Sequence, residues 1–242
     1  MTAAPNRRLS FGAALLAALA LLAASALLDA PGAGAHSTNR FFNTYPTDQN
    51  LSTVHAYFDS SVPGGRTRSR IISGARMWNR LERQLEFRTH RAAISGPGTG
   101  ACQAGPTGGP AGVVYWQTID GRGTDNRDTL AVTTDCVWNP GRPHEGRLAG
   151  FNMVFDSKQP SWYRRTGNAP AQSTDLWSVA SHEFGHAAGW GAHYGDDENK
   201  EICRADNMAR HTMCSIYYEG QTRTRTLQRH DKHTFRNVYP AR

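Results

Sequence analysis

Apolar residues at helical spacing predict helices over about residues 69–85 and 227–239, and capping residues before Leu176 with glycines after Ala188 predict another over 176–188. The apolar face of the first helix consists of Ile71, Ala75, Trp78, Leu81 and Leu85. One side of the last helix carries Leu227, Asp231, Phe235 and Val238. We expect the first helix to be amphipathic, with one face in the core.

Short runs of β-branched and aromatic residues, bounded by Gly, Pro, Asn and Asp, predict a sheet of about five strands. The runs are residues 54–58, 85–89, 113–119, 130–137 and 148–155. Residues 95–112 are dense in Gly and Pro and lack periodicity, which predicts a surface loop tethered by Cys102. Strands and helices in this order indicate an α+β domain without internal repeats.

The N-terminus resembles a secretory signal peptide. Arg7 and Arg8 precede an apolar run over about 11–28, which ends in the small residues of 33–35. We expect cleavage near Ala35–His36 and a secreted, extracellular protein, by either the Sec or the Tat route. No later run approaches the ~20 apolar residues that a membrane span needs, so we expect no stable membrane insertion.

The chain is basic, with 27 Lys and Arg against 20 Asp and Glu and a formal charge of +7. This balance favours anionic surfaces or acidic substrates without naming one. Six arginines follow one another closely: Arg66, Arg68, Arg70, Arg76, Arg80 and Arg83. A solvated helix face explains them better than a nucleic-acid interface does, because no aromatic residues alternate with them and no nucleic-acid module is present.

The four cysteines are expected to form two disulfides, because an even number in an exported chain is typical of that chemistry. We predict the pairs Cys102 with Cys136 and Cys203 with Cys214, since each closes a short loop. A cysteine-based zinc site is disfavoured, because no Cys-x-x-Cys spacing occurs.

The segment 181–193 carries the chemistry. It lies on the second predicted helix, which Ser173, Thr174 or Asp175 should cap and Gly189 or Gly191 should end.

Residues four apart share one face of a helix, so His182 and His186 can direct their ring nitrogens at one ion, with Glu183 beside them. Two imidazoles, a third protein ligand and an open position make a catalytic zinc site. One Zn²⁺ would lower the pKa of a bound water toward ~7, and Glu183 would take the proton from that water and pass it to the departing amine.

These residues resemble the metzincin clan of zinc peptidases, and within it the matrixins and their bacterial relatives. The clan's pattern is His-Glu-x-x-His-x-x-Gly-x-x-His followed by a Met-turn. His182, Glu183, His186 and Gly189 fall on it, and the stretch 211–214 resembles the Met-turn, with Met213 as its methionine. Residues 57–87 resemble the opening strand, helix and strand, and residues 227–239 the closing helix.

The resemblance implies a fold with a mixed twisted sheet, two long helices, an active-site cleft and a small C-terminal subdomain that holds the Met-turn and the terminal helix. The expected organisation is a signal peptide over 1–35, an arm over 36–52 and a catalytic domain over 53–242, divided near residue 189. The resemblance also implies that an extended polypeptide substrate pairs with an edge strand, matched here to Leu148–Phe155. We expect a monomer, and calcium binding stays open.

One departure concerns the third ligand. The pattern places a histidine where the chain has Ala192, and the histidine follows one residue later. We predict His193 as the ligand, delivered by a turn one residue longer that Gly191 makes accessible. The alternatives are His211, Asp196 and Asp197. A second departure is that residues 36–52 are too short for the clan's inhibitory prodomain and contain no cysteine.

The leading hypothesis is therefore a secreted zinc-dependent endopeptidase. One alternative is a zinc amidase that acts on cell-wall peptides, since the motif alone does not separate the two. The other is a non-catalytic, surface-binding module with a vestigial zinc site, which the presence of Glu183 disfavours, because a structural zinc needs no such carboxylate.

Overall fold

A computed structural model describes residues 44–46, 52–96, 98, 110–119, 129–138, 146–159, 161–191, 193, 211–214, 217 and 219–241 of the 242-residue chain. These residues belong to one compact unit, residues 38–242. The expected signal peptide and its cleavage site lie outside the described residues. Among the residues described, no helix is both long enough and apolar enough to cross a membrane.

The fold is α+β, as predicted, with a mixed five-stranded sheet and three α-helices. The strands of the main sheet are β1 (Ser52–Asp59), β2 (Leu85–Ile94), β3 (Ala111–Gln117), β4 (Ala131–Val137) and β5 (Leu148–Asp156). The helices are α2 (Arg66–Asn79), α3 (Leu176–Ala187) and α4 (Arg229–Val238), with a 3₁₀ turn, η5 (Arg223–Arg225), before the last. A small parallel pair, β6 (Trp162–Tyr163) and β7 (Thr174–Asp175), was not predicted.

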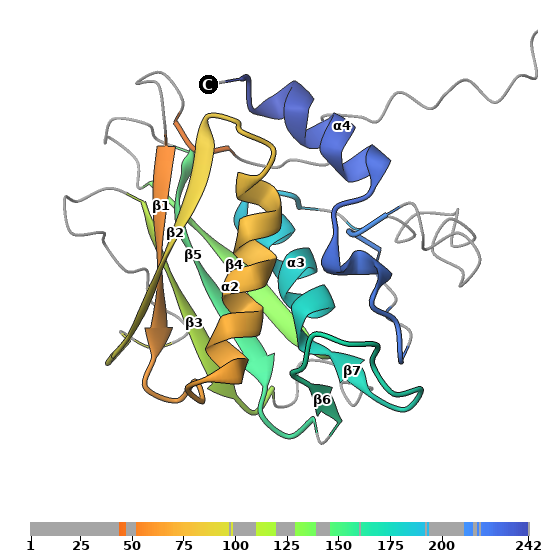
Figure 1. Ribbon diagram of the computed structural model, residues 1–242. Helices are drawn as coiled ribbons and strands as arrows, with labels where there is room; N and C mark the ends of the chain where they lie inside the picture. Colours follow the sequence, from red (N-terminus) through yellow and green to blue (C-terminus); the bar gives the residue numbers. More distant parts are fainter. Residues whose placement is uncertain are drawn as a thin grey trace, which may run out of the picture. The chain divides into compact units, whose positions relative to one another are not determined.

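The order of strands in the sheet is β2-β1-β3-β5-β4. Strands β2, β1, β3 and β5 run parallel, and β4 runs antiparallel to β5 at one edge. Figure 1 shows α2 and α3 side by side over one face of this sheet. Residues of β1 alternate between buried and partly exposed, which is the pattern of a strand whose second face meets solvent.

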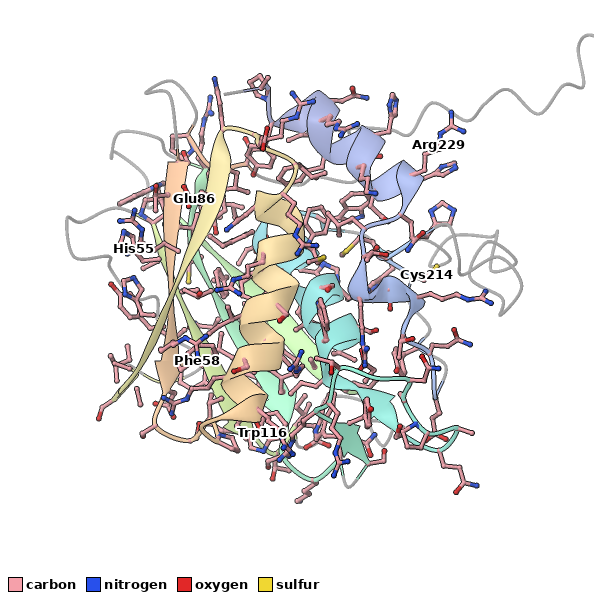
Figure 2. All side chains as sticks on the ribbon, viewed as in Figure 1. His55, Phe58, Glu86, Trp116, Cys214 and Arg229 are labelled. Atoms are coloured by element: carbon pink, nitrogen blue, oxygen red, sulfur yellow. The ribbon has the colours of Figure 1, made fainter. Side chains whose placement is uncertain are left out.

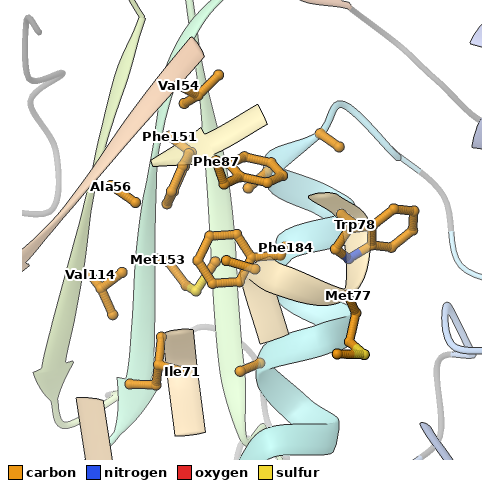
Figure 3. Close-up of a cluster of buried hydrophobic side chains, with 14 of the residues drawn as sticks. Val54, Ala56, Ile71, Met77, Trp78, Phe87, Val114, Phe151, Met153 and Phe184 are labelled. Atoms are coloured by element: carbon orange, nitrogen blue, oxygen red, sulfur yellow. The ribbon is translucent and has the colours of Figure 1, made fainter. Parts of the chain in front are cut away.

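The core lies between the sheet and α3, where aromatic rings interlock (Figure 3). Phe184 of α3 packs edge-on against Phe87 and Phe151 of the sheet, with ring centroids 5.0 and 5.8 Å apart. Such edge-to-face pairs add about 0.5–1.5 kcal/mol each to the burial of the rings. They hold the side of α3 opposite the predicted metal ligands firmly on the sheet.

Helix α2 approaches α3 closely at Gly74. A Cβ there would lie 2.6 Å from the backbone carbon of Ala180, so only glycine permits this spacing. One turn later the indole N–H of Trp78 donates to the carbonyl of Ser181 over 2.8 Å. Both contacts involve the residues that directly precede His182, so α2 helps to set the position of the predicted site.

Two tyrosines from the first and last segments that the structure describes bind the C-terminal end of α3. The hydroxyl of Tyr45 donates to the carbonyl of Ala187 over 2.9 Å, and that of Tyr239 to Ala188 over 2.7 Å. Both side chains are fully buried. Tyr45, which belongs to the expected arm, thus lies in the core. The carbonyls of Ala187 and Ala188 at the end of the helix are both hydrogen-bonded.

The predicted boundary of the first helix was wrong. Helix α2 ends at Asn79, and Glu82 adopts a left-handed conformation with φ 52° before β2 begins at Leu85. Leu81 and Leu85 continue the helical spacing by coincidence, because Leu85 is buried as the first residue of a strand. Apolar spacing alone does not separate these two cases.

Candidate metal centre

Helix α3 begins at a buried, charged cap. Asp175 is its N-cap and accepts a hydrogen bond from the backbone N–H of Ser178 over 2.9 Å. The guanidinium of Arg225 donates two hydrogen bonds to the same carboxylate, of 2.6 and 2.9 Å. Both groups are buried, and a planar two-point contact is the geometry in which such a pair is strongest. The C-terminal segment thereby fixes the start of the helix.

The helix ends as the glycine pattern predicted, at Gly189, which has φ 96°. The N–H of Gly189 donates to the carbonyl of His186, and that of Trp190 to Gly185, over 2.7 and 3.1 Å. This is a Schellman ending, which reverses the chain. Gly189 therefore makes this first turn, and the expectation that Gly191 eases the longer turn to His193 stays a prediction, because residue 192 lies outside the described residues.

After this reversal, the structure brings His182, His186 and His193 together. The Nε2 atom of His186 lies 3.1 Å from Nε2 of His182 and 2.9 Å from Nε2 of His193. The three ligand atoms form a group that could hold a metal ion. The additional residue before His193 is accommodated, since the imidazole still returns to the helix face.

Carbonyl groups determine which ring nitrogens face the cluster. Nδ1 of His182 lies 2.9 Å from the carbonyl oxygen of Thr212, and Nδ1 of His186 lies 2.5 Å from that of Trp190. A carbonyl can only accept, so both Nδ1 atoms must carry the proton. In the neutral rings both Nε2 atoms then present lone pairs to each other, an arrangement that a cation stabilises and that metal-ligating histidines commonly show.

Burial lowers the pKa of His182 well below its usual value, and the neighbouring rings of His186 and His193 lower it further. The imidazole therefore stays neutral at ordinary pH. Only a neutral imidazole can donate a lone pair to a metal, so this environment favours the ligating form.

Met213 packs directly against the helix turn that carries the two histidines. A Cβ on Gly185 would lie 2.2 Å from the sulfur of Met213, so the glycine leaves the space that the thioether fills. Met213 itself is fully buried. Met213 can occupy this position because Gly185, which lies between His182 and His186 in the sequence, has no side chain.

Asp231 of α4 holds the segment around Met213. Its carboxylate accepts hydrogen bonds from the N–H groups of Thr212, over 2.7 Å, and of Gln228, over 3.1 Å. Burial raises the pKa of Asp231 to about 6, and these N–H groups oppose the rise because they favour the ionised form. The carbonyl of Thr212 that binds His182 is thus oriented by a residue 19 positions later.

Glu183 lies beside the histidines, is 5% exposed, and points toward the edge strand β4. The hydroxyl of Thr133 donates to its Oε2 over 2.6 Å. Burial raises the pKa of Glu183 to about 7, and this hydrogen bond opposes the rise. A divalent cation at the three imidazoles would lower it further, so the carboxylate could accept a proton at neutral pH.

The expected role of Leu148–Phe155 as the edge strand was wrong. Strand β5 lies inside the sheet, between β3 and β4, and Ala131–Val137 forms the edge next to α3. Although β4 comes before β5 in the chain, β5 lies next to β3 and β4 lies outside it, paired antiparallel with β5. Any main-chain pairing with an extended ligand at this edge therefore has to use β4.

Thr133 was not among the predicted site residues. It lies in a predicted strand, but no local pattern could show that this strand turns its threonine toward Glu183.

Other expected residues fall in different places. The ring of His211 packs against His230, with centroids 4.7 Å apart, and His211 is not part of the three-histidine group. Asp196 and Asp197 lie outside the described residues. Cys136 and Cys214 are disulfide-bonded, while Cys102 and Cys203 lie outside the described residues, so the pairing stays a prediction.

No protein-family model matches the sequence, and no curated protein matches it at a significant level. The function therefore has to be argued from the site.

The sequence predicts a zinc peptidase with Glu183 as its general base, and in such an enzyme we expect the Thr133 hydroxyl to influence turnover through Glu183. Replacing Thr133 by valine removes a hydrogen bond to a charged group, which is worth about 1.5–3 kcal/mol, so kcat should fall roughly tenfold or more if proton transfer limits the rate. Thr133→Ser keeps the hydroxyl and should retain most of the activity. The measurement is kcat and KM for a peptide substrate over a range of pH.

Thr134→Val is the matched control, because Thr134 is exposed on the same strand. Equal kcat in Thr133→Val and the parent protein would remove Thr133 from the mechanism.

Proposed function

We propose that this chain is a secreted zinc-dependent endopeptidase of metzincin type. The observation that carries the proposal is the convergence of three imidazole nitrogens, two of them fixed by carbonyl groups with their lone pairs inward, beside a buried carboxylate. Three nitrogen ligands and a nearby acid are the donor set of a hydrolytic zinc site. A structural site would not need the acid.

The residues present fit a zinc ion. His182, His186 and His193 would hold it, and neutral imidazole is a ligand that zinc prefers. A bound zinc ion supplies Lewis acidity, which polarises a peptide carbonyl and acidifies water. Met213 beneath Gly185 and the Asp231 contact to Thr212 support the likeness to the Met-turn of the metzincins.

Glu183 performs the proton transfers in this proposal. Its carboxylate takes a proton from the attacking water and then delivers that proton to the departing amine. Thr133 holds Oε2 in place, so the other carboxylate oxygen, Oε1, is left to face the reacting groups. The burial of Glu183 keeps its proton affinity high enough for the second transfer.

Strand β4 is the surface that we assign to the substrate. It is the edge of the sheet closest to Glu183, and Thr133 connects the two. An extended polypeptide could pair with this edge through main-chain hydrogen bonds, which depend little on sequence. This geometry favours unfolded or flexible polypeptides over small amides.

The proposal predicts a metal-dependent protease. The purified secreted protein should contain about one zinc ion per chain, measured by mass spectrometry of the metal, and should cleave an unfolded protein substrate at internal bonds. A chelator should abolish cleavage, because the three imidazoles alone cannot activate water, and added zinc should restore it.

Two outcomes would contradict the proposal. Stoichiometric zinc without cleavage of any unfolded polypeptide would favour the non-catalytic module. Cleavage of cell-wall peptides, but not of unfolded proteins, would favour the amidase.

A further inference from the structure

A cavity that none of the three histidines lines lies where the beginning of α2 meets β6. Its volume is about 480 Å³. The residues that matter in its lining are Arg66, Arg164, Arg165, Trp162 and Tyr163. The beginning of α2 and strand β6 both lie at the end of the sheet where the parallel strands finish (Figure 1). The cavity thus combines segments about a hundred residues apart.

Three arginines line this cavity, and no acidic residue lies among its lining residues. Within the described part of the chain no carboxylate forms an ion pair with Arg66, Arg164 or Arg165. Arg225 behaves differently, since Asp175 neutralises it. Three like charges gathered around one space repel one another, and a bound anion removes that cost.

Hydrogen bonds from outside the cavity fix the segment that carries Arg164 and Arg165. The indole N–H of Trp162 donates to the carbonyl of Asp156 over 2.8 Å, and Arg225 donates to the carbonyl of Arg165 over 3.2 Å. Strand β6 pairs with β7, whose last residue caps α3. The backbone of the cavity is therefore fixed before any ligand arrives, which reduces the entropy lost on binding.

Arg164 is oriented by an aromatic contact. Its guanidinium carbon lies 5.2 Å from the centre of the Trp116 ring, which is a cation–π distance. Its Nε is buried and has no hydrogen-bond partner among the described residues. A donor that is buried and unsatisfied is costly, so a ligand that accepts from this side chain would be favoured.

The beginning of α2 adds to the positive potential. The N-cap, Gly65, offers no side-chain acceptor, and the first turn contains no acidic residue. The helix therefore leaves its N-terminal N–H groups and the positive end of its dipole uncompensated by side chains. Arg66, at the first position of the helix, lines the same cavity.

We propose that this cavity binds a tetrahedral oxyanion, a phosphate or sulfate group, through Arg66, Arg164 and Arg165. Three arginines around one cavity match an anion of charge near two better than a carboxylate of charge one, and the planar guanidinium fork suits both oxyanions. The site is independent of the metal centre. Its ligand is either a free anion or the same group carried on a polymer.

The first experiment is calorimetric titration of the mature protein with inorganic phosphate and with sulfate, each at constant ionic strength maintained with chloride. The parent protein should bind one anion per chain. Arg164→Gln/Arg165→Gln should lower the affinity at least tenfold. The matched control is Arg229→Gln/Arg236→Gln, which removes the same charge from two exposed positions on α4 and should not change the affinity. Figure 2 shows Arg229 on α4 and Trp116 at the opposite end of the sheet.

A second variant guards against misfolding. Arg66→Gln changes an exposed side chain that makes no hydrogen bond among the described residues, so it should fold as the parent does and still lower the affinity several-fold. The absence of a saturable signal in the parent protein would overturn the proposal. An unchanged affinity in Arg66→Gln and in the double variant would also overturn it.

A parallel titration with a sulfated polysaccharide identifies the source of the anion. Binding that is much tighter than for free sulfate, and that is lost in the double variant but retained in the control, assigns the site to a group on a polymer. Equal or weaker binding per sulfate group assigns it to a free anion. Both results are readable with zinc bound or removed, so they do not depend on peptidase activity.

Discussion

Glu183→Gln is expected to keep its metal and to lose about 10²- to 10⁴-fold in turnover, the range typical of a lost general base. Glutamine has nearly the same shape, and its side-chain oxygen can still accept the hydrogen bond of Thr133. It cannot take a proton from water. The measurements are kcat/KM for a peptide substrate and the zinc content of the same sample.

The acid limb of the pH profile belongs to the same prediction. Burial raises the pKa of Glu183 to about 7, and a bound cation lowers it, so activity should fall as the pH drops below 7 and the base becomes protonated. This limb should be absent from the residual activity of Glu183→Gln.

Glu86→Gln is the matched control for the Glu183 variant. Glu86 belongs to β2, at the edge of the sheet away from β4 (Figure 2). Its replacement should therefore leave the rate unchanged. Equal activity in Glu183→Gln and the parent protein would refute the proposed mechanism.

His193→Ala is expected to weaken zinc binding by more than about 100-fold. Loss of a residue that hydrogen-bonds to a metal ligand typically costs 10- to 100-fold in metal affinity, and loss of the ligand itself should cost more. His193 Nε2 lies 2.9 Å from that of His186, so its removal leaves two imidazoles. Competition with a chromophoric chelator measures the change.

His211→Ala is the comparison for that measurement. The ring of His211 packs on His230 rather than joining the three-histidine group, so its loss should change zinc affinity little. Circular dichroism of both variants would exclude unfolding as the cause. If His211→Ala had the larger effect, the ligand role would pass to His211.

Much of the local structure was readable from the sequence. The cap at Asp175, the stop at Gly189 and the spacing of His182 and His186 are all properties of neighbouring residues, and the observed helix obeys them. The strands also appear where β-branched and aromatic runs predict them, to within a few residues, apart from β2, which continues to Ile94. Helix geometry and side-chain shape act over a few positions, so local sequence carries this information.

The place of β4 and the partner of Glu183 were decided only by the tertiary structure. Chain order alone does not say which of strands β4 and β5 forms the edge of the sheet. The pairing of β4 with β5 in antiparallel register turns Thr133 toward α3. That contact joins residues 50 positions apart, and no periodicity extends over such a distance.

The sequence by itself determined the helix that presents two imidazoles and an acid, because side-chain direction on a helix depends only on residue spacing. Three features depended on the folded chain: the return of His193, the carbonyls that orient His182 and His186, and the gathering of arginines around a cavity near β6. Each arises where segments distant in sequence pack together, and the packing of a whole core, rather than any local preference, sets those distances.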